Sequence, residues 1–188
     1  MSRWEPDARG RLEKAALELY ADRGFDRTTV AEIARRAGLT ERTFFRHYAD
    51  KREVLFHGQS ALTDLVVGTL SDAPAGLAPI DAVVGALEAA DGFFGDRRDG
   101  ARLRQGVISA HAELRERELI KLAHLAAAMT DALHARGVPD PTAGLAAEAG
   151  IAVFRTAFER WLADDEDRDF AQHVRESLQA LRAVTAGS

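Results

Sequence analysis

A short stretch near the amino terminus most constrains what this chain can fold into. It reads TTVAEIARRAGLTERTFFRHYADKR and spans residues 28–52. Thr29 followed three residues later by Glu32 is a capping box, which satisfies free amides at the start of a helix. Gly38 is suited to end that helix, because glycine adopts the left-handed conformation without a steric penalty. Thr40 caps a second helix, so the spacing predicts a helix-turn-helix.

Positive charge is concentrated on this motif. Residues 35–52 hold six Lys or Arg side chains against two acidic ones, although the whole chain has a net charge of −5. Residues 1–57 hold 12 basic and 10 acidic side chains, whereas residues 58–188 hold 13 basic and 20 acidic ones. A local basic excess on an acidic chain indicates that the N-terminal part faces a polyanion such as nucleic acid.

The remainder of the chain has helical spacing and no alternating strand pattern. A third motif helix is expected to begin at Asp50 and to continue to Leu70, and SDAPAGLAP then breaks it at residues 71–79. Further helices are expected at 80–94, near 102–109, from there to Gly137, from Pro141 with Asp140 as its N-cap, and from Phe170. The prediction is an all-α protein with a three-helix helix-turn-helix domain at residues 1–52. A helical ligand-binding and dimerisation domain is expected at residues 53–188.

Several classes of protein are disfavoured. The chain has no cysteine, which rules out disulfides and thiolate metal sites and favours a reducing cytoplasm. It has no apolar signal segment and no run of the roughly 20 apolar residues that a membrane span needs, so we expect a soluble cytoplasmic protein without a membrane partner. HExxH, GxSxG and glycine-rich phosphate loops are absent from the sequence, so neither an enzyme nor a cofactor or metal is expected.

Residues 24–56 resemble a known family. They read GFDRTTVAEIARRAGLTERTFFRHYADKREVLF and are similar to the DNA-binding segment of the TetR family of bacterial transcriptional regulators. The G-F, T-T, G-L-T and T-F-F positions fall at the spacing of that family. Residues 112–138, AELRERELIKLAHLAAAMTDALHARGV, are similar to members that sense acyl thioesters or other fatty ligands.

The resemblance implies which residues meet DNA. Glu41, Arg42 and Thr43 correspond to the base-reading start of the recognition helix, where an arginine can bond guanine and a glutamate can accept from cytosine. For Glu41 the alternative is a solvated surface residue. Phe45 departs from the tyrosine of many relatives and offers only apolar contact, for instance to a thymine methyl. The positions that correspond to phosphate contacts are Thr28, Thr29, Arg46, His47 and Lys51. The full expected set is Thr28, Thr29, Thr40, Glu41, Arg42, Thr43, Phe45, Arg46, His47 and Lys51.

The resemblance also implies a ligand cavity in the C-terminal domain. Ligand binding there moves the connecting helix and changes the separation of two recognition helices. The candidate wall residues share an apolar character and lie on helices that should converge: Phe93, Phe94, Ile108, His111, Leu125, Met129, Phe154 and Phe158. His111 is the polar member that would orient a ligand. The alternative is that each of these side chains belongs to the core.

Residues 142–184 read as two helices, and the first carries two apolar stripes, which indicates packing on two sides. The resemblance places the dimer interface here as a four-helix bundle; the alternative is an intramolecular core. The expected interface residues are Val153, Ala157, Trp161, Val174, Leu178 and Leu181. The expected function is a homodimeric repressor that a small apolar or amphipathic effector releases from a palindromic double-stranded DNA operator. The alternatives are a ligand-responsive activator and a helical interaction module without sequence-specific DNA binding.

Overall fold

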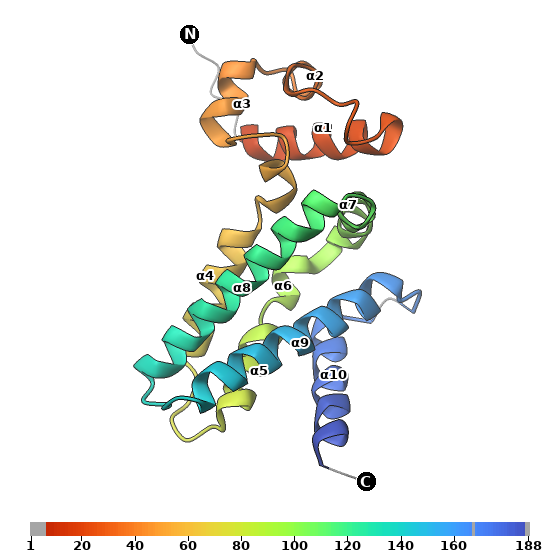
Figure 1. Cartoon of the computed structure of the whole chain (residues 1–188). Helices are drawn as coiled ribbons and strands as arrows, with labels where there is room; N and C mark the ends of the chain where they lie inside the picture. Colours follow the sequence, from red (N-terminus) through yellow and green to blue (C-terminus); the bar gives the residue numbers. More distant parts are fainter. Residues whose placement is uncertain (1–6, 167, 187–188) are drawn as a thin grey trace. The chain divides into compact units, whose positions relative to one another are not determined.

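Helices form every regular element of the described residues, 7–166 and 168–186, in the computed structural model of the chain (Figure 1). The all-α prediction is therefore confirmed. The elements are α1 (Ala8–Arg23), α2 (Val30–Arg36), α3 (Glu41–His47), η1 (Glu53–Phe56), α4 (Gln59–Ser71), α5 (Pro79–Glu88), α6 (Asp91–Phe94), η2 (Gly95–Arg97), α7 (Arg98–Ala110), α8 (Ala112–Ala135), α9 (Thr142–Ala163) and α10 (Phe170–Thr185).

Two compact units make up the chain. The N-terminal unit contains Met1–Gly58 together with Asp99–Glu118, and the C-terminal unit contains Gln59–Arg98 and Leu119–Ser188. This division differs from the expected boundary between residues 52 and 53. The physical reason is that η1 packs against α1 and that most of α7 and the start of α8 return to the first unit.

The N-terminal unit is built around one apolar core. In it α1 contacts α2 and η1, and α2 contacts α3 (Figure 1). Phe25, Ile33 and Phe44 are almost fully buried in this core, and Ile108 and Leu114 reach it from the returning segment. The helix α3 therefore rests on a packed support rather than on a mobile loop.

The predicted helix caps are formed. Thr29 Oγ1 accepts a hydrogen bond from the Glu32 amide at 3.3 Å, and the Thr29 amide donates to Glu32 Oε2 at 2.9 Å. Gly38 has a φ of 69°, in the left-handed region that glycine favours. Thr40 Oγ1 accepts from the Thr43 amide at 3.2 Å and starts α3. These local bonds explain why the boundaries of α2 and α3 follow from sequence.

The expected continuous helix from Asp50 to Leu70 is wrong. Asp50 Oδ1 does accept from the amides of Arg52 and Glu53, at 2.8 and 3.1 Å. The 3₁₀ helix η1 that follows nevertheless ends at Phe56, and α4 begins only at Gln59. The consecutive residues 54, 55 and 56 are all buried, and a one-sided amphipathic α-helix does not bury three neighbours in a row.

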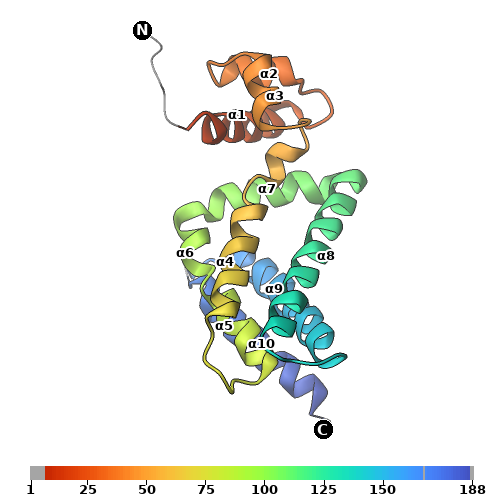
Figure 2. The same ribbon diagram turned by 90° about the vertical axis from the view of Figure 1, so that its left-hand side faces the viewer.

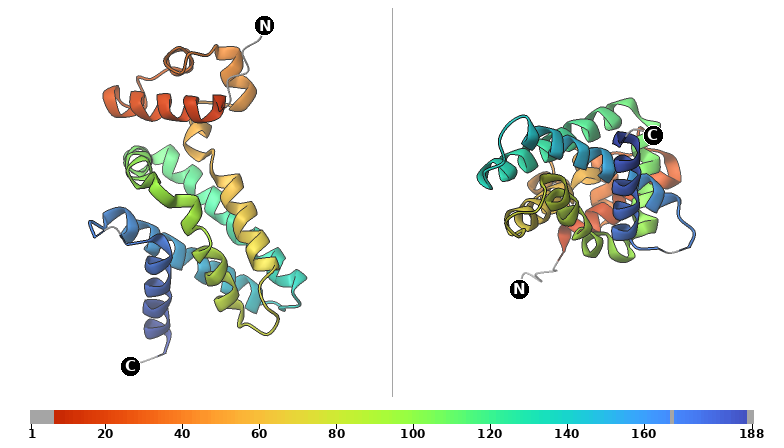
Figure 3. Two further views of the ribbon diagram at one scale, coloured as in Figure 1. Left: turned by 180° about the vertical axis from the view of Figure 1, so that it is seen from behind. Right: turned by 90° about the horizontal axis from the view of Figure 1, so that it is seen from below.

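The C-terminal unit packs α5 against α4, α9 and α10, and α10 also lies against α9 (Figures 2 and 3). Gly150 of α9 permits the close approach of α5, because a Cβ at this position would lie 2.4 Å from Val83 Cγ1. The two apolar stripes of α9 thus face two helices of the same chain. None of the helices that the structure describes combines the length and the hydrophobicity needed to cross a membrane.

Candidate nucleic-acid interface

The exposed face of α3 carries Glu41, Arg42, Phe45 and Arg46. The Phe45 side chain is 56% exposed, which is unusual for a phenylalanine, whereas Phe44 beside it is fully buried. Helical geometry separates the two because neighbouring residues point about 100° apart. The helix α3 therefore packs the Phe44 ring into the core and presents the Phe45 ring to solvent.

Two arginines on this face are free to meet a partner. Among the described residues, Arg42 and Arg46 form no ion pair and no side-chain hydrogen bond. By contrast, Arg36 of α2 pairs with Glu18 at 2.7 Å. An unpaired guanidinium keeps its donors available for guanine or phosphate oxygens.

The threonines of the motif are used within the protein. Thr28 is buried, and its hydroxyl donates to the carbonyl of Gly24 at 2.9 Å. The hydroxyl thus satisfies a carbonyl just beyond the end of α1, and the expected phosphate contact of Thr28 stays a prediction. Thr29 and Thr40 are exposed, but both hydroxyls serve the caps of their helices. Thr43 is half-buried, and its hydroxyl lies 3.0 Å from that of Thr40.

Lys51 also has a structural role. Its Nζ donates to the carbonyls of Phe25 at 2.8 Å, Thr28 at 3.0 Å and Asp26 at 3.3 Å. The same atom lies 4.3 Å from the centre of the Phe25 ring. An ammonium has three donors, and all three are used here. In this structure the side chain fixes the loop between α1 and α2, and the expected phosphate contact of Lys51 stays a prediction.

His47 is half-buried at the end of α3, and its Nε2 finds no hydrogen-bond partner in the described part of the chain. Burial, followed by the positive charges of Arg46 and Arg9, lowers the pKa of His47. The ring is accordingly neutral near pH 7. A phosphate that approached the exposed part of the ring would favour the protonated form.

The returning segment is tied to the motif by arginines. Arg117 Nε lies 2.9 Å from Glu53 Oε1, and its Nη1 lies 3.2 Å from Asp50 Oδ2. The half-buried Arg104 donates to the carbonyl of Leu55 and pairs with Glu118 at 3.7 Å. Sequence reasoning missed both arginines, because no local pattern marks a cation whose partners lie far along the chain.

Two of the expected ligand residues belong to this unit. Ile108 is fully buried in its core. The ring of His111 lies 5.1 Å from that of Phe25, its Nδ1 is 2.8 Å from the carbonyl of Val107, and its Nε2 is 3.7 Å from Asp26 Oδ2. The segment that carries both residues belongs to the N-terminal unit, and their part in a ligand site stays a prediction.

The other aromatic candidates gather in the C-terminal unit. The Phe94 ring lies 5.5 Å from Phe158 and 6.3 Å from Phe154, and Phe93 lies 5.4 Å from Phe94. Phe93 and Phe158 are half-buried, which leaves part of each ring accessible. Sequence reasoning did not include Phe170 in this set, although its ring lies 4.6 Å from Phe94. We call Phe93, Phe94, Phe154, Phe158 and Phe170 the aromatic cluster.

Leu125 and Met129 are fully buried in the C-terminal unit. The structure also buries most of the expected dimer residues inside the single chain: Val153, Ala157, Trp161, Val174 and Leu178. Leu181 is half-buried. Three of these side chains lie on α9 and two on α10, and all five are covered within their own chain, where α9 contacts α5 and α10. The expected interface stays a prediction.

Comparisons with known proteins assign this architecture. Residues 12–57 match the family described as "Bacterial regulatory proteins, tetR family", and residues 77–186 match the "MftR C-terminal domain", which alone spans more than half of the chain. The chain belongs to the TetR family. Its N-terminal part is therefore a TetR-type helix-turn-helix domain, as the resemblance implied.

Individual relatives of this TetR protein match to different extents. The regulator TcmR of Streptomyces glaucescens is 40% identical over 92 residues, which are 49% of this chain and 39% of TcmR, so the match spans about two fifths of that relative. The mycofactocin biosynthesis transcriptional regulator MftR of Mycobacterium tuberculosis H37Rv is 28% identical over 157 residues. These residues are 82% of this chain and 79% of MftR.

Solved structures share the fold. SmeT of Stenotrophomonas maltophilia in complex with triclosan superposes with a TM-score of 0.65 at 19% identity, covering 94% of this chain and 90% of SmeT. Bacillus subtilis FadR in complex with stearoyl-CoA gives 0.58 at 17% identity, covering 92% and 96%.

Proposed function

We propose that this TetR-family protein is a homodimeric repressor that binds a palindromic operator and is released by a small apolar or amphipathic ligand. The observation that carries the proposal is the pair of exposed, unpaired arginines on α3 beside the exposed ring of Phe45. A recognition helix that exposes these side chains enters the major groove, where the residues at its start reach base edges.

Each exposed side chain of α3 has a distinct role in this proposal. Arg42 donates two hydrogen bonds to a guanine, and Glu41 accepts one from a cytosine amino group. Phe45 packs against a thymine methyl. Arg46 and His47 lie at the end of the helix and hold phosphates, which sets register without reading sequence. Thr29, Thr40 and Thr43 support these contacts through their caps.

The proposed effector site is the aromatic cluster of the C-terminal unit. Its half-buried rings offer apolar surface that a ligand can cover, and covering it is favourable. SmeT and Bacillus subtilis FadR were solved with triclosan and stearoyl-CoA, and both ligands have a large apolar part. A ligand of this character releases the operator only if it binds the DNA-free conformation more tightly than the DNA-bound one.

The proposed dimer uses the outer faces of α9 and α10. Leu145 is 67% exposed, Val184 is 81% exposed, and Ala152 and Thr156 lie on the exposed side of α9. Apolar and small side chains let the helices of a second copy approach closely. A twofold axis between copies pairs two recognition helices with two half-sites of an inverted repeat.

The test is selection of bound fragments from a random double-stranded DNA library by the purified chain near physiological salt. An inverted repeat is the expected result. The variant Arg42→Ala/Arg46→Ala should lose the enrichment. The matched control Arg115→Ala removes an exposed charge from α8, which belongs neither to α3 nor to the proposed dimer face, and should retain the enrichment. Enrichment of a single asymmetric site contradicts the dimer, and no enrichment by the folded chain contradicts sequence-specific reading.

The effector part is tested with the selected operator. Compounds are screened for loss of the protein–DNA complex, and an apolar or amphipathic compound is the expected hit. Phe158→Ala should then raise the ligand concentration needed for release about tenfold or more, because a well-packed aromatic contact contributes about 1–2 kcal/mol. A response that is unchanged in this variant contradicts the aromatic cluster as the site.

A further inference from the structure

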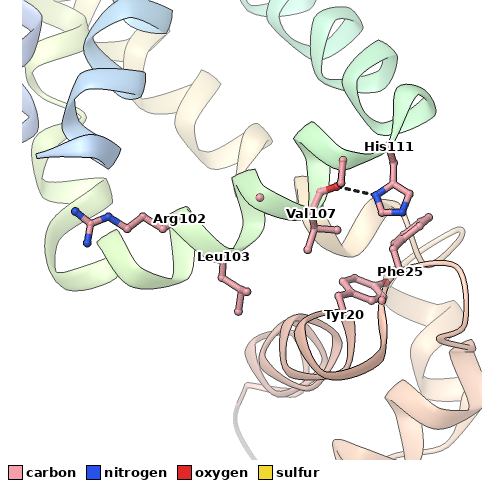
Figure 4. Close-up of a pocket in the computed structure, with 9 residues that line it drawn as sticks. Tyr20, Phe25, Arg102, Leu103, Val107 and His111 are labelled. Carbon is pink, nitrogen blue, oxygen red and sulfur yellow. Dashed lines mark hydrogen bonds between the residues drawn. The ribbon is translucent and has the colours of Figure 1, made fainter.

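A groove lies within the N-terminal unit, between the end of α1 and α7 (Figure 4). Its volume is about 610 Å³, which is within the range of small-molecule sites. Tyr20 and Phe25 form one wall, and Leu103 and Val107 of α7 form the other. Gly106 lies between these two α7 residues and has no side chain to fill the space.

The polar groups around the groove are already engaged. The Tyr20 hydroxyl donates to the carbonyl of Lys51 at 2.8 Å, and burial raises the pKa of this phenol. His111 Nδ1 lies 2.8 Å from the Val107 carbonyl, while Nε2 faces Asp26 at 3.7 Å. The guanidinium of Arg102 points away from Tyr20 and Phe25 (Figure 4) and lies 3.8 Å from Asp99. A charged ligand would lose its hydration here without gaining a matching partner.

Apolar surface at the groove, in contrast, remains uncovered. Leu103 is 37% exposed, although a leucine gains by leaving water. We propose that this groove binds a neutral, largely apolar small molecule, at a site separate from the aromatic cluster. The occupant covers Leu103 and closes over the wall that Tyr20 and Phe25 form. Phe25, in the loop that leads into α2, in turn lies against Lys51. The site therefore acts on the unit that carries the recognition helix.

Gly106 allows the groove to be filled by a single substitution. A Cβ built at Gly106 meets nothing within 4 Å, so Gly106→Leu extends into the groove without displacing a neighbour. Leucine also has a higher helix propensity than glycine. Gly100 is a matched control: it lies in the same helix, is exposed, does not line the groove and has the same open surroundings. Gly100→Leu therefore changes helix propensity and surface apolarity alike while leaving the groove open.

The experiment measures binding of N-phenyl-1-naphthylamine, a neutral apolar fluorescent dye, to the full chain without DNA. Gly106→Leu is expected to weaken binding at one class of site at least tenfold, while Gly100→Leu binds like the unsubstituted chain. Dye bound by the aromatic cluster should contribute the same fluorescence in all three proteins. The methyl NMR signals of Leu103 and Val107 should shift on addition of dye.

Dye titrations that are identical in Gly106→Leu and the unsubstituted chain overturn the proposal, as do unshifted methyl signals of Leu103 and Val107. If Gly106→Leu fails to fold, Ala110→Leu fills the groove from the next helical turn and has the same expected outcome. Because the readout involves no operator, its failure is distinct from a failure of the proposed repressor function.

Discussion

At the scale of single residues, the positive charges of the motif fall into two groups. Arg42 and Arg46 are exposed, and their side chains make no hydrogen bond within the described residues. Lys51, in contrast, donates three hydrogen bonds to carbonyls of the α1–α2 loop. The first group is available to DNA, and the second stabilises the unit that presents it. Substitutions in the two groups should therefore affect different measurements.

Arg42→Ala should lower the affinity for the selected operator by about 1–3 kcal/mol, because a bidentate contact to guanine is lost. The same variant should bind nearly as well as the unsubstituted chain to an operator altered at the contacted base pair. Fluorescence anisotropy with both DNAs measures the difference. An equal loss on both DNAs would assign Arg42 to a phosphate instead.

Lys51→Met should lower the free energy of unfolding by about 1–3 kcal/mol, since three carbonyls lose a charged donor and the aliphatic length is kept. Urea unfolding followed by circular dichroism measures this change. Lys14→Met is the matched control, because Lys14 is an exposed lysine of α1, and it should stay within about 0.5 kcal/mol. Equal stability of the two variants would show that the bonds of Lys51 contribute nothing net.

At the scale of elements, the turn between α9 and α10 is held by one carboxylate. Asp164 accepts from the amides of Glu166 and Arg168, from the Arg168 side chain at 3.0 Å and from His173 Nε2 at 3.2 Å. The hydrogen bonds from Arg168 hold the pKa of Asp164 far below its ordinary range, and the hydrogen bonds from Glu166 and His173 also lower it. The segment DDEDRD suggested a solvated turn, but Asp164 is buried. Asp167 lies outside the described residues.

Asp164→Asn should lower the free energy of unfolding at pH 7. The difference between the variant and the unsubstituted chain should become smaller in acid. A depressed carboxyl pKa stabilises the folded state above the unfolded pKa of about 4, and the contribution disappears as the pH falls towards the folded value. Unfolding free energies at pH 7 and pH 3 should therefore differ more for the unsubstituted chain than for the variant. Asp131→Asn, at an exposed position of α8, should follow the unsubstituted chain at both pH values.

Local chemistry explains which elements were predictable. Thr29, Glu32, Gly38 and Thr40 lie within a few residues of the groups that they bind, so α2 and α3 follow from sequence. The contacts of Thr28, Lys51 and His111 depend on partners that tertiary packing brings close. Residue type alone does not predict such partners. The double stripe on α9 likewise records burial on two sides without saying whether the second side meets the same chain or another copy.

At the scale of the whole molecule, dimerisation should depend on the outer face of α9. Ala152→Arg places a charged side chain at the centre of the proposed interface and should yield monomers, because a buried unpaired charge is costly. Analytical ultracentrifugation measures the mass. Ala127→Arg makes the same exchange at an exposed alanine of α8 and should remain dimeric. Equal masses for the two variants would show that the dimer interface does not include the outer face of α9.

The N-terminal unit is discontinuous, since Asp99–Glu118 completes the core begun by residues up to Gly58. A gene fragment that ends at Gly58 would lack Ile108 and Leu114 and would leave the apolar side chains that they cover in water. Exchange of DNA specificity between this regulator and its relatives therefore requires both segments to be transplanted together. A graft of the helix-turn-helix alone would inherit the contacts to DNA but not the complete core that holds them.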